Sequence, residues 1–198
     1  MIILLVNSGF LQAQIRPGYI IGINRSTLEI KSADLTKKPE TITGIHFGGA
    51  LDIPINKNIS FQPNLLFTAK GSNFTFDSTE YSLSPIYVEI PVYLVFSTGS
   101  DYIRLQLSAG SYVACGVGGY KIVSGGQLQD LRYGSGSEKD LRTFDAGFNF
   151  GAGIYFGGFV ISVRYEIGLP NLMPSSSPAT EMKNKVLGIS LSSLFIYQ

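Results

Sequence analysis

The stretch IRLQLSAGSYVACGV (residues 103–117) alternates in polarity over most of its length. Apolar side chains take most of the odd-numbered positions, whereas polar or small residues such as Arg104, Gln106 and Tyr112 take the even-numbered ones. A period of two places successive side chains on opposite faces of an extended chain. The stretch therefore predicts a β-strand whose two faces lie in different surroundings.

The same alternation recurs along the chain. Strands are predicted at residues 17–29, 42–54, 58–74, 84–97, 102–118, 143–156, 159–171 and 185–197. Short connections at 55–57, 98–101 and 157–158 each contain the Gly or Asn that tight turns require. Long connections are predicted at 30–41, 75–83, 119–142 and 172–184, and the Gly- and Ser-rich residues 124–140 are typical of a mobile surface loop. This long–short order predicts an all-β, eight-stranded antiparallel up-and-down transmembrane β-barrel.

Composition favours the same class. The chain has 198 residues, enough for one all-β domain, and is 44% hydrophobic but only 15% charged. It contains no run of about 18 apolar residues, which excludes a transmembrane helix of ordinary length. The net charge of +1 gives no case for a nucleic-acid partner, and the single cysteine, Cys115, excludes an internal disulfide.

The N-terminal residues MIILLVNSGFLQAQ (1–14) are similar to the end of a secretory signal peptide, with cleavage expected after Ala13. We therefore expect a signal peptide at 1–13 and an outer-membrane barrel domain at 14–198. The alternative is that this segment is an ordinary apolar first strand.

The nature of the polar face decides which face points outward. Water-facing surfaces are usually rich in Lys, Glu and Asp, whereas the polar face here is rich in small residues such as Gly147, Gly151 and Gly153. Small residues suit the crowded interior of a narrow barrel. We therefore expect apolar faces in the lipid of a bacterial outer membrane, with both chain termini periplasmic. A soluble lipocalin-like ligand-binding barrel, with the apolar faces inside, is the alternative.

Aromatic residues near the predicted strand ends are typical of interfacial girdles. On the short-turn side these are Phe61, Phe96, Phe156, Phe159, Phe195 and Tyr197. Toward the long connections the candidates are Phe74 and Phe144.

The polar face carries charges of both signs. By register the lumen holds His46, Asp52, Gln62, Asn64, Lys70, Glu89, Arg104, Gln106, Asp145, Arg164 and Glu166. Charges away from bulk water need partners. We expect a structural polar network of Lys70, Glu89, Arg104, Asp145, Arg164 and Glu166 that plugs the lumen. A path for a ligand or an ion is the alternative.

No catalytic, cofactor or metal site is expected. A His-dependent hydrolase would have to use His46, the only histidine, and Asp52 lies about 20 Å away along the same extended strand. A carboxylate across the barrel, such as Asp145, stays open as a partner. Ser108 and Ser190 face the lumen by register, but nothing marks either as a nucleophile. No phosphate loop, zinc-ligand spacing or EF-hand pattern occurs.

Three segments carry a family resemblance. QPNLLFTAKG (62–71), YVEIPVYLVF (87–96) and GYIIGINRSTL (18–28) resemble strands of the PorT-like outer-membrane β-barrels of Bacteroidetes. The resemblance implies an eight-stranded outer-membrane barrel of mostly unassigned function. The founding members of that family are linked to protein secretion across the outer membrane by the type IX system.

The resemblance also bears on single residues. Lys70 and Glu89 match the family motifs, which implies a structural pair, whereas Asn64 stands where the family often has Glu. We expect a non-enzymatic barrel that serves as an accessory or interaction subunit of an outer-membrane complex for secretion or uptake, with other outer-membrane or periplasmic proteins as partners. A narrow pore for small solutes is the second hypothesis.

Overall fold

The computed structural model describes residues 15–31, 35–76, 78–136, 138–174 and 181–194, and strands make up most of them. The strands are β1 (Arg16–Lys31), β2 (Leu35–Pro54), β3 (Ile59–Ala69), β4 (Ser72–Phe76), β5 (Thr79–Gly99), β6 (Ile103–Val123), β7 (Gln129–Asp130), β8 (Phe144–Phe156), β9 (Phe159–Gly168) and β10 (Glu181–Leu194). The expected signal peptide at 1–13 lies outside the described residues. In the described part of the chain, no helix is long and apolar enough to cross a membrane.

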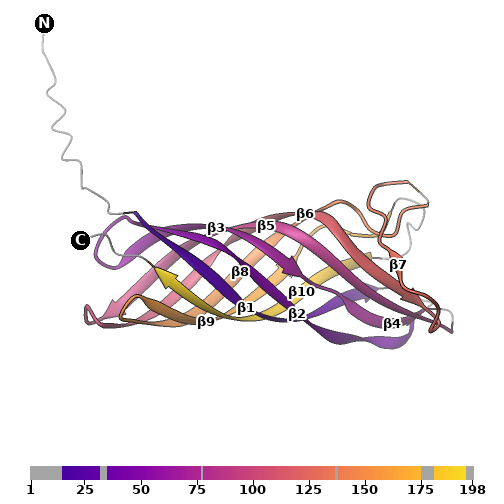
Figure 1. Cartoon of the computed structure of the whole chain (residues 1–198), viewed down its shortest axis with the longest axis horizontal. Coiled ribbons are helices and arrows are strands. Elements are labelled where there is room, and N and C mark those ends of the chain that lie inside the picture. The colour runs from indigo at the N-terminus through magenta and orange to yellow at the C-terminus, as the bar shows by residue number, and fades with distance from the viewer. Residues whose placement is uncertain (1–14, 32–34, 77, 137, 175–180, 195–198) are drawn as a thin grey trace, which may run out of the picture.

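The sheet closes into a barrel. Antiparallel pairings run from β1 through β2, β3, β5, β6, β8 and β9 to β10, which pairs with β1 again. Figure 1 shows these strands tilted around a long cylinder, with the first residues of β1 and the last of β10 at one end. Closure gives each strand of the ring a partner on both sides, which a lipid environment requires.

The two ends of the barrel differ. The connections β2–β3, β5–β6 and β8–β9 are short and lie beside the first residues of β1, at what we call the tight-turn end. The opposite end, called the loop end, carries residues 124–143 and 169–174. There β4 continues the path of β3 between β2 and β5, and the two-residue β7 pairs with β6.

Two of the predicted long connections are wrong. Residues 35–41 of the predicted loop 30–41 belong to β2, and β4 and β5 take up most of the predicted loop 75–83. β2, β5 and β6 reach 20 or 21 residues, about twice the 9–11 that a membrane strand needs. Above the membrane both faces of such a strand can be polar, so the sequence there lacks the alternation that marks the rest.

The predicted orientation of the two faces is confirmed by side-chain exposure. Large apolar side chains are exposed around the outside of the ring, among them Ile21, Ile23, Ile45, Phe47, Leu65, Phe67, Leu94, Leu107, Phe148, Phe150, Ile161, Val163, Ile189 and Leu191. Inside the ring, behind this belt of apolar residues, polar side chains of the same strands face inward and are buried. The outer surface therefore matches lipid rather than water.

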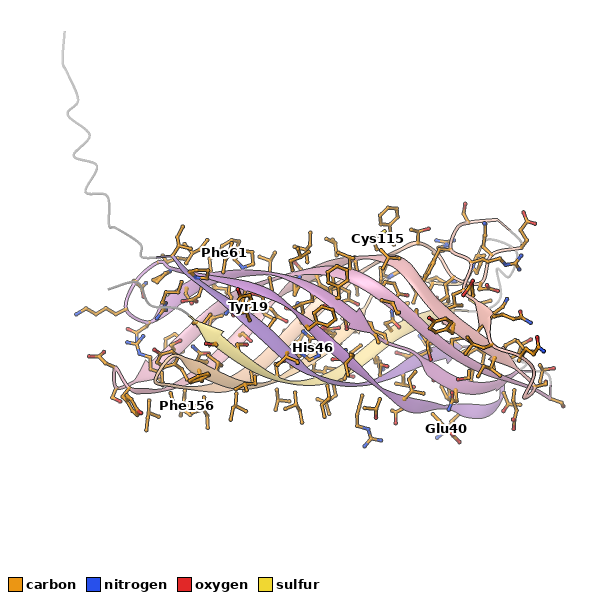
Figure 2. The ribbon with its side chains drawn as sticks, viewed as in Figure 1. Tyr19, Glu40, His46, Phe61, Cys115 and Phe156 are labelled. Atoms are coloured by element: carbon orange, nitrogen blue, oxygen red, sulfur yellow. The ribbon has the colours of Figure 1, made fainter. Side chains whose placement is uncertain are left out.

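The predicted aromatic girdles are partly right. Phe61 and Phe156 lie toward the tight-turn end (Figure 2), and Phe144 is 72% exposed on the outside of β8. Phe74 is wrong as a girdle residue: it is 9% exposed and packs inside the loop end of the barrel. Phe195 and Tyr197 lie outside the described residues.

Small residues make room for the large ones inside. A Cβ on Gly147 would lie 2.7 Å from the Tyr112 ring, and a Cβ on Gly188 would lie 2.8 Å from Nε of Arg164. Both distances are shorter than van der Waals contact, so the glycines of the polar face are needed to accommodate the lumenal side chains.

Candidate functional site

A cluster of four charged side chains crosses the middle of the lumen. Nζ of Lys70 lies 2.6 Å from Oε2 of Glu89 and 3.0 Å from Oε2 of Glu166. Nε of Arg164 lies 3.1 Å from Oε1 of Glu166. The side chains of Lys70, Glu89 and Glu166 have no exposed surface. We call these four residues the ion cluster.

The strands bring the ion cluster together from distant parts of the chain. Lys70 stands between β3 and β4, and its backbone N–H donates to the carbonyl of Pro85 on β5. The following Gly71 has a φ of +145°, and a side chain at this position would meet the backbone of Leu83. This close approach of β5 holds the backbone where Lys70 points into the barrel.

Two tyrosines enclose the ammonium group of Lys70. Nζ lies 4.5 Å from the centroid of the Tyr112 ring and 5.6 Å from that of Tyr87. Both rings are nearly fully buried. A cation over an aromatic face is stabilised by about 0.5–2 kcal/mol, the upper end applying where water is excluded. The rings therefore add to the two ion pairs in holding Lys70.

Asp145 joins the ion cluster indirectly. Its Oδ2 accepts hydrogen bonds from the hydroxyl of Tyr112 at 3.0 Å and from Nδ2 of Asn184 at 2.8 Å. Tyr112 thus links this carboxylate to Lys70. Of the six residues that the sequence places in the network, five lie together in this way.

Arg104 lies apart from the other five. Its Nη2 is 4.0 Å from Oδ1 of Asp101 in the turn before β6, and about a quarter of its side chain is exposed. The reason is height along the barrel: Arg104 pairs in register with Gly99 and Tyr155, near the tight-turn end.

Neutral side chains of the lumen extend the network. Nδ2 of Asn24 donates to the Thr68 hydroxyl at 2.7 Å, and Nη2 of Arg164 donates to Oδ1 of Asn24 at 3.3 Å. Asn24, Tyr87 and Asn184 are not among the residues that the sequence places in the network. Their positions on the inward face of a strand were the only available signal.

The His46 side chain offers no catalytic triad. Its Nε2 lies 2.8 Å from the Ser190 hydroxyl, while its Nδ1 is buried without a hydrogen-bond partner among the described residues. Asp145, which the sequence left open as its acid, bonds to other residues. Within the described ranges, no three His, Cys, Asp or Glu side chains are arranged to hold a metal ion. The Ser–His contact thus lacks the carboxylate that orients the base in such sites.

The loop end of the lumen is filled by apolar side chains. We call this group the apolar cap, and it consists of Leu28, Ile30, Phe74, Leu83, Leu131, Leu141, Leu172 and Met182. Strands supply five of these residues, and the loops at 124–143 and 169–174 supply the three leucines Leu131, Leu141 and Leu172. The prediction of a mobile surface loop at 124–140 is therefore wrong for the part that packs into the barrel.

Tyr133 anchors the same loop. Its hydroxyl donates to the carbonyl of Gly118 at 2.7 Å, and its ring meets the ring of Tyr87 edge to face at 6.2 Å. Burial raises the pKa of the Tyr133 hydroxyl, which keeps it neutral and a hydrogen-bond donor. The apolar cap therefore rests directly on the tyrosines that surround the ion cluster.

One ion pair on the outside of the barrel is exposed to water. Nζ of Lys185 lies 2.7 Å from Oε2 of Glu29, beyond the apolar belt toward the loop end. The hydrogen bond to Lys185 lowers the pKa of Glu29, and the same contact raises that of Lys185. More than a third of each side chain is exposed, so water screens this ion pair, whereas it does not screen the buried ion cluster.

One protein family and several solved structures are similar to this chain. The sequence model of one protein family, described as an outer membrane protein beta-barrel domain, matches residues 10–173. No curated protein matches the sequence.

Several solved structures are similar in fold. The attachment invasion locus protein Ail of Yersinia pestis, in complex with the heparin analogue sucrose octasulfate, is 15% identical, with 92% of this chain and 99% of that chain covered and a TM-score of 0.47. Neisserial surface protein A is 11% identical, with 89% and 97% covered and a TM-score of 0.45. The N-terminal β-barrel domain of Pseudomonas aeruginosa OprF is 13% identical, with 89% and 97% covered and a TM-score of 0.33.

Proposed function

Because the chain belongs to the outer membrane protein β-barrel domain family, we propose that it is a non-enzymatic, non-conducting barrel that contacts partner proteins outside the hydrocarbon region. The observation that carries the proposal is the closure of the lumen by two successive layers, the apolar cap and the ion cluster. A solute would have to displace both layers to pass.

The energetic cost of opening supports a permanent closure. Moving the leucines of the apolar cap into water costs about 1.5–3 kcal/mol for each side chain. Separating the ion cluster costs several kcal/mol more, because each charge would lose its partner in a low-dielectric interior. These two layers leave no open path for diffusion through the lumen.

The strands beyond the membrane supply the contact surface. At the loop end, the neighbouring strands β2, β4, β5 and β6 extend past the apolar belt (Figure 1), and we call this part of the sheet the wall. This wall carries a groove of about 300 Å³ whose lining includes Lys38, Glu40, Asn73, Glu80 and Ile122. A groove with charged, amide and apolar groups suits a protein segment better than a lipid tail.

The proposal places the tight-turn end in the periplasm, since short periplasmic turns and longer external connections are the rule in such barrels. The resemblance of residues 62–71 and 87–96 to PorT-like proteins favours an accessory role in an outer-membrane complex for secretion or uptake. The test is affinity purification of the full chain from native outer membranes in mild detergent. A partner that is lost when Glu80 is replaced by Lys, but retained when the exposed Glu29 is replaced by Lys, supports the proposal. Recovery of the protein alone under the mildest extraction would contradict it.

A narrow pore for small solutes is the second candidate. The observation that favours it is a polar cavity in the tight-turn half of the lumen, lined in part by Gln62, Gln106 and Arg164. Swelling of protein-containing liposomes in small sugars or amino acids distinguishes the two candidates: swelling above that of empty liposomes supports the pore.

A further inference from the structure

The cavity in the tight-turn half of the lumen has an unusual lining. It measures about 50 Å³, and its polar lining comprises three amide side chains, four serines, Tyr93 and a single charged residue, Arg164. No carboxylate is among the lining residues in the part of the chain that the structure describes. The cavity is several times larger than a single water molecule requires.

One arginine lines this cavity, and a second lies near it on β6. Arg164, a member of the ion cluster, lines the cavity, and the Tyr93 hydroxyl interacts with its guanidinium. Arg104 precedes the lining residue Gln106 by two positions on the same inward face of β6, which places the two Cα atoms about 7 Å apart. Nη1 of Arg164 and Nε of Arg104 are buried without a hydrogen-bond partner among the described residues.

The described charges of the lumen are polarised along the barrel axis. Three carboxylates, Glu89, Glu166 and Asp145, lie on the loop side of the cavity around Lys70, and Glu166 also pairs with Arg164 at the cavity lining. On the tight-turn side, Arg104 is accompanied by the pair of Arg16 and Asp52, whose net charge is zero. Arg104, whose contact Asp101 is 4.0 Å away and fully exposed, therefore adds a positive charge to the half of the lumen that contains the cavity.

The charge distribution and the polar lining favour an anionic ligand over a cationic one. Among the described lining residues, a cation would meet the Arg164 guanidinium and no carboxylate, whereas an anion would meet guanidinium, hydroxyl and amide donors. Hydrogen bonds from an ionised donor to an anion are about twice as strong as neutral ones. We propose that the cavity lined by Arg164 binds a small inorganic anion of about the size of chloride or bromide.

The first test locates the ion. Crystals of the full chain grown in sodium bromide should give an anomalous bromine peak inside the cavity, within hydrogen-bonding distance of Arg164 or of a lining serine. A cavity that contains only water oxygens at saturating bromide would overturn the proposal.

The second test measures affinity in solution. The thermal midpoint of the detergent-solubilised protein is titrated with bromide against gluconate, an anion too large for the cavity, at constant ionic strength. Binding to the folded state raises the midpoint with bromide concentration. Equal midpoints in the two salts would contradict a bound anion.

Variants make the test specific. Gln106→Glu places a negative charge in the lining at nearly constant volume, and it should raise the bromide dissociation constant at least tenfold. Gln127→Glu adds the same charge on the exposed loop and should leave the constant unchanged. If Gln106→Glu does not fold, Ser108→Ala removes one donor without adding charge and should weaken bromide binding at least threefold. An unchanged constant in the folded lining variant would refute the site.

Discussion

Replacement of Glu166 by glutamine tests how the ion cluster stabilises the barrel. Glu166 is fully buried and contacts both Lys70 and Arg164, at 3.0 and 3.1 Å. In Glu166→Gln, Lys70 retains Glu89 at 2.6 Å, whereas Arg164 has no other carboxylate within salt-bridge distance among the described residues. Leaving a buried charge unpaired costs about 3–5 kcal/mol, so we expect a loss of this size in the free energy of unfolding.

Two matched variants separate this effect from a general loss of charge. Glu89→Gln leaves both cations with Glu166, so its cost should be about 1–3 kcal/mol, as for a single lost hydrogen-bond partner to a charged group. Glu29→Gln removes the exposed partner of Lys185 and should cost less than about 1 kcal/mol.

The assay is reversible urea unfolding of the protein in lipid vesicles, followed by the far-ultraviolet circular dichroism of the sheet. The structure predicts a fixed order of destabilisation, with Glu166→Gln largest, Glu89→Gln intermediate and Glu29→Gln smallest. Equal losses for the three variants, or a Glu166→Gln protein as stable as the wild type, would refute the reasoning.

Three further predictions concern the outer face, the apolar cap and the lumenal glycines. Phe150→Arg puts a charge on the lipid side of β8 and should lower the free energy of unfolding in vesicles by about 2–4 kcal/mol if the residue lies near the bilayer midplane; no loss would contradict its lipid exposure. Leu141→Ala removes a fully buried side chain of the apolar cap and should cost about 2–5 kcal/mol, detected as trypsin cleavage of the loop 124–143 at least tenfold faster than in the wild type; unchanged cleavage would contradict the packing of this loop. Gly147→Val should lower the yield of folded, heat-modifiable barrel on gels because its side chain meets the backbone carbonyl of Ile167 and the Tyr112 ring, whereas Gly118→Ala, where a Cβ meets nothing within 4 Å, should fold normally; equal yields would refute the crowding argument.

The membrane-spanning part of the barrel could be predicted from the sequence because lipid imposes a strict pattern. Each strand there has one face in hydrocarbon and one in a narrow lumen, so a period of two assigns residues such as Phe150 and Glu166 to opposite faces. The same pattern places Lys70, Glu89, Asp145 and Arg164 inside without any knowledge of their contacts.

Contacts along the barrel axis could not be predicted in the same way. Alternation gives the face of a residue but not its height, which depends on the register between strands. Arg104 is for this reason assigned to the network by sequence, yet it lies near the tight-turn end beside Asp101. Register is fixed by pairings between distant segments, and a single sequence does not contain them.

The loop end escaped prediction for a different reason. β2 and β5 continue beyond the apolar belt, where water on the outside removes the contrast between the faces. Leu131 and Leu141 are isolated apolar residues in a polar segment and lie ten positions apart. No periodic pattern around them indicates that they are buried. Their packing depends on the complete ring, because only the closed barrel provides the mouth that they fill.

The most direct test of the closed lumen is the electrical conductance of the purified full chain in planar lipid bilayers. Two layers, the ion cluster and the apolar cap, lie across the path of any solute. A closed lumen predicts that the current at moderate voltage stays at the level of a protein-free bilayer, while the same preparation is shown by gel mobility to be folded and inserted. A steady open state of large conductance in the wild-type protein would contradict it.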